Sequence, residues 1–200
     1  MGTKESVMLL FNKWNTGEIE IQDTGLKNVI ALDPAIIPIS FGRHEHQRLK
    51  KAEVHIIERL VNKLMHFGKK YAKNTGRMGG KKSRMIKTVK TSLDLIHHET
   101  GKNPVELLIR AIENAAPNED TTRIVYGGVV YHVSVDVAPL RRIDLALRFI
   151  AEGVRESAYS NPKSMEEALA KEIVLASNNS MESHSVKKKN EQERIAMSSR

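Results

Sequence analysis

The sequence predicts a mainly α protein, in which a bundle of helices carries a projecting β-hairpin arm and follows an extended N-terminal extension. Apolar residues recur at helical spacing through most of the chain after residue 45. The stretch 129–137 instead alternates apolar and polar side chains, and it follows a Gly-Gly pair. Near the start of the chain, Pro34 and Pro38 impose extended backbone on the residues before them. A chain of 200 residues can bury a core as a single domain.

The N-terminal extension is predicted over residues 1–44, and the helical domain over residues 45–200. Turn-forming residues at 14–17 and 23–25 separate short pieces of extended chain. Residues 19–22 alternate apolar and polar side chains as in a strand. We expect this segment to pack on the helical body or on a neighbouring molecule.

The first helix is predicted over 45–67 and the second over 82–99. The first carries an apolar stripe at helical spacing, formed by Leu49, Ile56, Leu60 and Leu64. Gly68 is expected to cap it. The second carries a stripe of its own, and Gly101 follows it as glycine commonly follows a helix.

Three further helices have recognisable start signals. Asn103 and Pro104 suit the N-cap and the first helical position of the third helix. Pro139 opens the fourth helix, which is expected to run to about residue 157. Ser164 begins a capping box for the fifth helix.

The chain is predicted to end in a polar loop and a final helix or tail. The loop spans 177–185, and the helix or tail spans 190–200, after three consecutive lysines.

A β-hairpin is predicted at about 121–137. Its second half alternates apolar and polar residues, and Gly127-Gly128 suits a two-residue hairpin turn. Because an isolated two-stranded hairpin is only weakly stable, we expect the arm to project towards a partner or to lie against the helices.

The net charge of +8 arises in one region of the chain. Residues 45–110 hold sixteen basic and six acidic side chains, whereas 1–44 hold four and five, and 111–200 hold twelve and thirteen. A regional excess is typical of a binding surface. At its centre, residues 67–90 hold nine basic side chains and no acidic one: Lys69, Lys70, Lys73, Arg77, Lys81, Lys82, Arg84, Lys87 and Lys90.

This basic stretch predicts a polyanionic partner. Nine like charges repel one another and destabilise the free protein, so a partner that neutralises them is expected. The phosphate backbone of a nucleic acid is the leading candidate. The alternative is a solvated basic surface without a partner.

A second set of basic residues lies on the predicted fourth helix. Arg141 and Arg142 stand at its start, and Arg148 and Arg155 share a face with Arg141 because they are spaced seven apart. Guanidinium groups suit bidentate contacts with phosphate. Acidic residues one turn ahead of the last two make intrahelical ion pairs the alternative. We favour RNA contact for Arg141 and Arg142 and leave both interpretations open for Arg148 and Arg155.

The sequence shows no pattern typical of catalysis, so no enzyme activity, metal or cofactor is predicted. The chain has no cysteine, which excludes a disulfide framework and fits a reducing cytoplasm. The glycine-rich stretch 76–83 lacks the Ser or Thr and the preceding strand of a phosphate-binding loop. Neighbouring histidines at 44, 46, 97 and 98 lack the spacing of metal ligands. No apolar run approaches the roughly 20 residues that cross a bilayer, so no membrane contact is expected. The alternative from another class is a DNA-binding helical regulator.

Several motifs, in this order, resemble the universal family of small-subunit ribosomal protein S seven in its archaeal and eukaryotic form. They are LMHFGKK at 64–70, GKNPVELLIRAIENAAP at 101–117, YGGVVYHVSVDVAPLRRIDLALRFI at 126–150 and SVKKKNEQERIA at 185–196. The stretch LDPAIIPISFGRHEH at 32–46 resembles the extension found in those lineages. The resemblance runs from about Leu32 to Arg200, and the Gly-Gly turn of the hairpin favours an archaeal type.

The resemblance implies a domain of about six helices with a β-hairpin arm, acting as a structural constituent of the small ribosomal subunit in the cytoplasm. It implies binding to rRNA of the head, or three-prime major, domain and nucleation of head assembly. It also implies a position near the exit-site tRNA and the mRNA exit path, with neighbouring head ribosomal proteins as further partners. The hairpin is expected to point towards the tRNA and mRNA.

The family's RNA-binding surface matches the basic stretch and the Arg141-Arg142 pair. The similarity of the last motif adds the basic residues of the tail, Lys187, Lys188, Lys189 and Arg194, to the expected RNA-binding set. One departure from bacterial members concerns the first hairpin strand, where acidic Glu119 and Asp120 precede a lone Arg123. Direct RNA contact by that strand is therefore left open.

Overall fold

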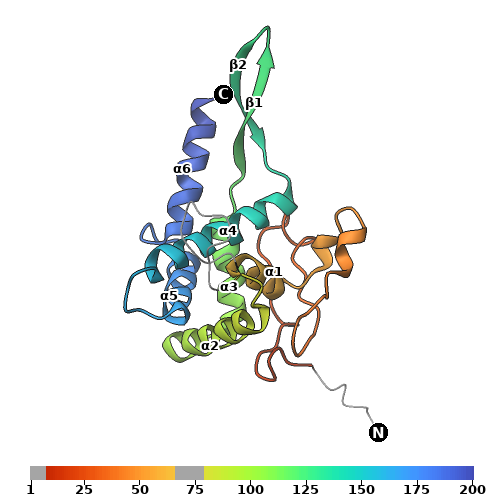
Figure 1. Ribbon diagram of the computed structural model, residues 1–200, viewed down its shortest axis with the longest axis vertical. Coiled ribbons are helices and arrows are strands. Elements are labelled where there is room, and N and C mark those ends of the chain that lie inside the picture. Colours follow the sequence, from red (N-terminus) through yellow and green to blue (C-terminus); the bar gives the residue numbers. More distant parts are fainter. Residues whose placement is uncertain (1–7, 66–78) are drawn as a thin grey trace.

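A computed structural model of the chain describes residues 8–65 and 79–200. These residues form a helical body from which a two-stranded hairpin extends along the longest axis (Figure 1). The mainly α prediction, with its hairpin arm, is confirmed. The described helices are α1 (Ile56–Leu64), α2 (Lys82–Thr100), α3 (Pro104–Ala115), α4 (Pro139–Ala158), α5 (Met165–Ser177) and α6 (His184–Ser198).

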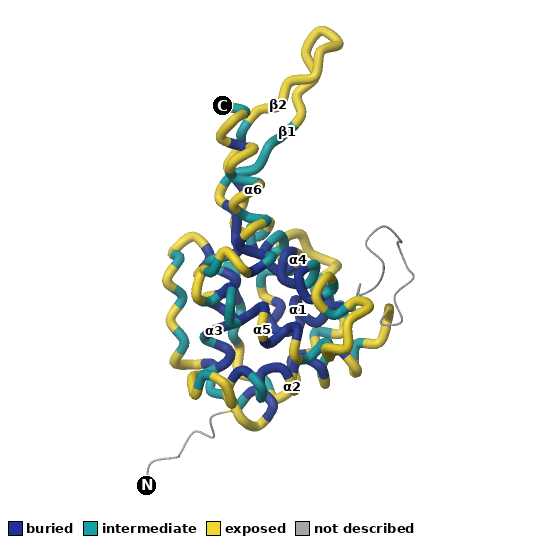
Figure 2. Tube along the Cα trace, turned by 90° about the vertical axis from the view of Figure 1, so that its left-hand side faces the viewer, coloured by how far each residue is buried: buried dark blue, intermediate teal, exposed yellow. Residues whose placement is uncertain are grey.

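The apolar faces of these helices enclose one core. α5 packs against α2, α3 and α4, and its Leu169 and Ile173 are fully buried. Figure 2 shows buried residues concentrated in the body, whereas the hairpin is exposed along most of its length. Burial of apolar side chains on several helices stabilises this arrangement, because each largely buried one contributes about 1.5–3 kcal/mol.

Four of the predicted helix starts are confirmed. α2 begins at Lys82 and ends at Thr100, directly before Gly101. The side chain of Asn103 accepts a hydrogen bond from the Val105 amide at 3.1 Å and caps α3. α4 begins at the predicted Pro139, and Ser164 caps α5 by accepting from the Glu167 amide at 3.2 Å.

The first helix begins eleven residues later than predicted, at Ile56 instead of Glu45. Two short 3-10 turns, η1 (Arg43–His46) and η2 (Lys50–Glu53), occupy the earlier part. Leu49 lies between them with a left-handed φ of 65° and is 66% exposed, so it is not part of the apolar stripe. The helix starts where the Nδ1 atom of His55 accepts from the Ile57 amide at 3.2 Å. The predicted end at Phe67 and the cap at Gly68 lie outside the described residues.

The N-terminal segment packs on the helical body. Leu10, Phe11, Leu26 and Ile30 are buried and belong to the core. Residues 19–22 form no strand. Instead, the Glu113 carboxylate of α3 accepts hydrogen bonds from the backbone amides at positions 22 and 23, at 2.7 and 2.9 Å. A helix side chain thus takes the place of a strand partner.

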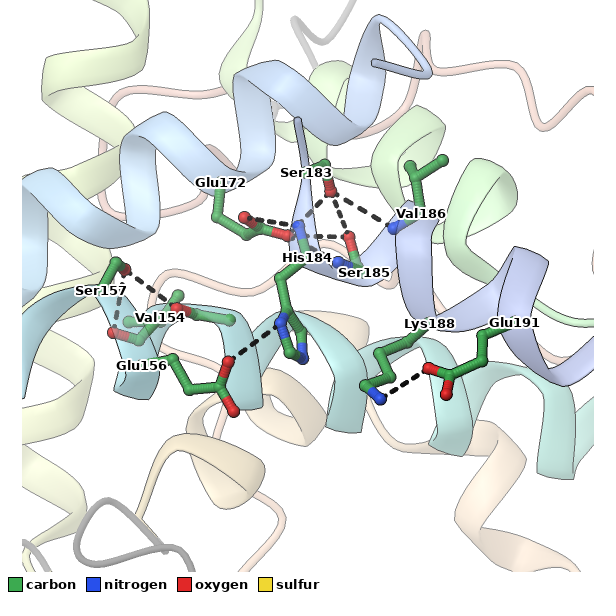
Figure 3. Close-up of polar contacts among 11 residues, drawn as sticks. Val154, Glu156, Ser157, Glu172, Ser183, His184, Ser185, Val186, Lys188 and Glu191 are labelled. Atoms are coloured by element: carbon green, nitrogen blue, oxygen red, sulfur yellow. Dashed lines mark hydrogen bonds and ion pairs between the residues drawn. The ribbon is translucent and has the colours of Figure 1, made fainter. Parts of the chain in front are cut away.

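The last helix begins six residues earlier than predicted, at His184. The cause is the buried Glu172 of α5, whose carboxylate accepts from the hydroxyls of Ser183 and Ser185 at 2.8 and 2.9 Å (Figure 3). The Ser183 hydroxyl also accepts from the Val186 amide at 3.3 Å. These bonds satisfy the first turn of α6, so the predicted polar loop is shorter and the three lysines lie within the helix.

The hairpin is formed by β1 (Glu119–Tyr126) and β2 (Val129–Asp136), as predicted. Gly127 and Gly128 both have positive φ, 57° and 81°, as the favoured two-residue turn requires. The base of the arm is joined to α6, because the Ser134 amide donates to the Ser199 carbonyl and Arg200 forms an ion pair with Glu119. The tip makes no such contact within the described residues, and Tyr126 there is 80% exposed.

Candidate nucleic-acid interface

The start of α2 presents a basic surface that corresponds to the second half of the predicted basic stretch. Lys81, Arg84, Lys87 and Lys90 are exposed, and the buried stripe of α2 faces away from the last three. The first turn of α2 holds no acidic residue. The positive end of the helix dipole therefore adds to these charges, and no carboxylate of that turn offsets it. An anion is the complement of this surface.

Lys82 differs from its neighbours because it already has a carboxylate partner. It forms an ion pair with the buried Glu58 of α1. Glu58 also accepts from the Ser40 amide at 2.8 Å and the Ser40 hydroxyl at 2.9 Å. Burial by itself would raise the pKa of Glu58, but the bonds from Lys82 and Ser40 outweigh it and hold that pKa below its ordinary value. Lys82 thus joins α2 to α1.

Four predicted residues, Lys69, Lys70, Lys73 and Arg77, lie outside the described part of the chain.

Arg141 and Arg142 are neighbours with different surroundings. The side chain of Arg141 is 64% exposed and lies 3.1 Å from Asp120 at the base of the hairpin. The side chain of Arg142 is 13% exposed. Its Nη2 lies 2.8 Å from Asp23, and its Nε donates to the Pro117 carbonyl at 3.2 Å. Arg141 is available to a partner, whereas Arg142 is used inside the protein.

Intrahelical pairing, one of the two interpretations left open for Arg148 and Arg155, is found for Arg148, but with the residue one turn after it. Arg148 pairs with Glu152, at 2.9 Å, and is largely exposed. Asp144, the acidic residue one turn ahead of Arg148, contacts Lys51 at 2.8 Å instead. Arg155 lies half-buried in the last turn of α4. Arg148 therefore remains the more accessible of the two to a partner.

The basic residues of the tail lie on α6. Lys187 and Arg194 are exposed, and Lys189 is half-buried. Lys188 forms an ion pair with Glu191 at 2.6 Å (Figure 3).

The described basic residues are spread along the molecule. α2 lies at the end of the body opposite the hairpin, whereas α6 runs from the body towards the hairpin (Figures 1 and 2). α4 crosses between them and packs on α1, α5 and α6. This distribution suits many separate contacts with an extended polyanion better than one deep binding pocket.

The sequence analysis missed one group of basic residues. Lys51 of η2 and Arg59 and Lys63 of α1 lie around Asp144 of α4, at 2.8, 3.6 and 3.7 Å. Lys63 follows Arg59 by four residues, so the sequence places these two on one face of a helix. Nothing in the sequence indicates that Lys51 and Asp144, which are 93 positions apart, would meet.

Neither a metal-binding group nor a membrane-spanning helix is found among the described residues. Residues 8–65 and 79–200 contain no group of three or more His, Asp or Glu side chains that could hold a metal ion. No helix among them is both long and apolar enough for a membrane span.

Comparison with known protein families gives a match over most of the chain. The model of the family described as Ribosomal protein S7p/S5e matches residues 26–200. The chain is 62% identical over 193 residues to "Small ribosomal subunit protein uS7" of Cenarchaeum symbiosum (strain A), covering 96% of this chain and 97% of that protein. It is 44% identical over 189 residues to the protein of the same name from Methanosphaera stadtmanae, covering 94% and 97%.

Proposed function

Because the chain belongs to the ribosomal protein S7p/S5e family, whose members are non-enzymatic structural constituents of the small ribosomal subunit, we propose a specific role for it in the subunit head. It binds rRNA of the three-prime major domain and nucleates assembly of the head. It lies beside neighbouring head proteins, near the exit-site tRNA and the mRNA exit path.

The observation that carries RNA binding is the exposed basic surface at the start of α2. Lys81, Arg84 and Lys87 lie on a helix whose first turn has no acidic residue. Phosphate contacts of this kind hold RNA without reading its sequence, and the shape of a folded rRNA junction supplies the selectivity. Arg141, Arg148, Lys187 and Arg194 extend this set of exposed cations across α4 and α6.

The hairpin is suited to a different kind of contact. The two acidic residues of its first strand bind the protein itself, Glu119 through Arg200 and Asp120 through Arg141. Its tip presents the exposed side chains of Val125, Tyr126 and Tyr131, with few charges among them. We infer that the arm reaches towards the tRNA and mRNA path through apolar and aromatic contacts, and not through phosphate neutralisation.

The experiment that tests RNA binding is a salt titration with a head-domain rRNA fragment. Lys81, Arg84 and Lys87 are each replaced by Gln in one triple variant, which leaves the Lys82–Glu58 ion pair intact. Each lost phosphate contact lowers the slope of log K against log[salt] by about 0.7–0.9. We therefore expect the triple variant to lose about two units of slope and to bind more weakly at low salt.

The matched control removes three exposed lysines elsewhere, Lys102, Lys163 and Lys171. Lys163 and Lys171 line a cleft that also holds Glu156, Glu167 and Glu182, an environment unsuited to phosphate. The control should keep the wild-type slope. Equal slopes for the two triple variants would contradict the α2 interface. If the wild-type protein binds duplex DNA of the same length as tightly as the rRNA fragment, a general polyanion surface or a DNA-binding regulator would be favoured.

A further inference from the structure

A small hollow between the 3-10 turns η1 and η2, α1 and α4 contains an unusual balance of charge. It has a volume of about 240 Å³, and its lining includes Lys51, Arg59, Lys63 and Asp144. Three cations thus face one carboxylate. Lys51 donates to both oxygens of Asp144, at 2.9 and 2.8 Å, so this pair is fully formed. The positive charges of Arg59 and Lys63 are left in excess.

The guanidinium of Arg59 has hydrogen-bonding capacity that the described residues do not use. Its side chain is 2% exposed, and its Nη1 donates to the Val29 carbonyl at 3.1 Å. Its Nε and Nη2 atoms are buried and have no hydrogen-bond partner in the described part of the chain. The Asp144 carboxylate lies 3.6 Å from Nη2, close enough for an ion pair but too far for a hydrogen bond. Buried donors of this kind are costly to leave unpaired, and charged ones especially so.

These two nitrogens, which lack a hydrogen-bond partner among the described residues, are well placed for one particular ligand. Nε and Nη2 lie on the same edge of the planar guanidinium, which is the edge that binds two oxygens of a phosphate side by side. Lys63 stands one turn further along α1 and lies 3.7 Å from Asp144. Its pKa is lowered by burial and by the positive charges of Lys51, Arg59 and Arg148, against the opposing effect of Asp144. A second anion in the hollow would relieve this repulsion.

We propose that this hollow binds one phosphate group of an RNA backbone, held by the free edge of Arg59 and by the ammonium of Lys63. Asp144 keeps Lys51 as its partner and holds the cations together when the site is empty of RNA. The site uses residues of η2, α1 and α4 and shares none with the basic surface of α2. The RNA source of the phosphate rests on the proposed function, whereas binding of free phosphate does not.

The proposal is tested first without RNA. Thermal unfolding of the full chain is measured in inorganic phosphate and in sodium chloride at matched ionic strength. Phosphate bound in the hollow should raise the Tm of the wild-type protein, because a ligand that binds only the folded state stabilises that state. Lys63→Gln should show a smaller rise. Lys171→Gln, which removes the same charge from an exposed position on α5, should respond as the wild type does.

The second measurement is the salt titration with the head-domain rRNA fragment. Lys63→Gln should lose about 0.7–0.9 units of slope, the value of one phosphate contact, and Lys171→Gln should lose none. Arg59→Lys keeps the charge but removes the two-nitrogen edge, so it should weaken RNA binding and reduce the phosphate response. If that buried substitution prevents folding, Lys63→Gln decides the question.

The outcomes separate this proposal from the RNA-binding role of α2. A slope that falls for the α2 triple variant but not for Lys63→Gln overturns the hollow as an RNA contact and leaves the proposed function standing. A phosphate response that depends on Lys63, with no RNA binding by the wild type, supports the hollow as a free phosphate site and contradicts the proposed function. Wild-type responses from Lys63→Gln in both measurements overturn the site altogether.

Discussion

Arg142 of α4 and Asp23 of the N-terminal segment form an ion pair at 2.8 Å across 119 positions of sequence. The same guanidinium donates to the Pro117 carbonyl, directly before the hairpin. One side chain therefore joins α4, the N-terminal segment and the base of the arm. Its neighbour Arg141 reaches only an acidic residue at the base of the hairpin and remains largely exposed.

These different surroundings predict opposite effects of the same substitution at adjacent positions. Arg142→Gln should lower the free energy of unfolding by about 2 kcal/mol, because it leaves Asp23 and the Pro117 carbonyl without their donor. Its RNA salt slope should stay unchanged. Arg141→Gln should change stability by less than about 1 kcal/mol, as an exposed ion pair does, and lower the salt slope by about one unit. Urea denaturation and the RNA titration measure the two quantities.

Each variant is the control for the other. A lowered slope for Arg142→Gln with undiminished stability would show that Arg142 contacts RNA instead of holding the fold.

The buried His55 should make the stability of the folded protein depend on pH. Burial lowers its pKa from 6.5 to about 4, against the opposing effects of Asp33 and Glu58. The unfolded chain therefore binds more protons than the folded one between those values, so stability falls as the pH falls from about 6.5 to about 4. The full loss is about 3 kcal/mol, and roughly half of it should appear between pH 6.5 and 5.

His55→Asn tests this assignment, because Asn keeps a side-chain acceptor for the Ile57 amide but does not titrate. Urea denaturation at pH 6.5 and pH 5 should show a smaller loss of stability in the variant than in the wild type. Carboxylates with lowered pKa values, such as Glu58 and Asp144, lose their stabilising charge only at lower pH. An unchanged pH dependence in the variant would place the titrating group elsewhere.

At Gly153, where α4 meets the start of α6, there is too little room for a side chain. A Cβ atom at this position would lie 2.8 Å from the Cβ of His184 and 3.1 Å from the Cδ of Glu172. Gly153→Ala should therefore destabilise the protein by about 1–3 kcal/mol, although alanine is favoured over glycine in an unhindered helix by about 1 kcal/mol. Chemical denaturation measures the change.

A double-mutant cycle with His184→Gly supplies the control. Removing the His184 side chain relieves the shortest contact, so Gly153→Ala should cost less in that background than in the wild type. Equal costs in both backgrounds would mean that this contact is not the source of the destabilisation.

A substitution in the hairpin turn should destabilise the tip of the arm without affecting the helical body. Gly128→Ala places a side chain at a φ of 81°, which should cost about 1–2 kcal/mol in the turn. Strand amides near the tip should then exchange hydrogen faster, with no change in the amides of α3 and α5, because the tip contributes little to the core. Tyr126→Thr, at a neighbouring exposed position, should leave exchange nearly as in the wild type. Faster exchange throughout the body would contradict this separation.

Features that depend on neighbouring residues were predictable from the sequence. The caps of Asn103 and Ser164 and the Gly-Gly turn are examples, because the residues that form each bond lie within a few positions. The start of α1 was not predictable. The apolar residues around Leu49 fit a helical pattern, but the structure turns the chain at that residue and exposes its side chain.

The same distinction applies to the candidate interface. Charge density selected the basic residues, yet it did not separate those used inside the protein from those left exposed. Lys82 and Arg142 find carboxylates 24 and 119 positions away, and Lys51 finds one 93 positions away. Such pairings follow from how the helices pack, which no local pattern encodes.

The attachment of the N-terminal segment to α3 and α4 sets an order of events during synthesis. Asp23 emerges long before Arg142, and at roughly 5–20 residues per second the interval is about 6–24 s. During that time Leu10 and Phe11 lack the later helices of the core that bury them in the finished protein. The first part of the chain to be made is therefore among the last to reach its final place, and the nascent protein exposes apolar surface until the later core helices, α5 among them, have been translated.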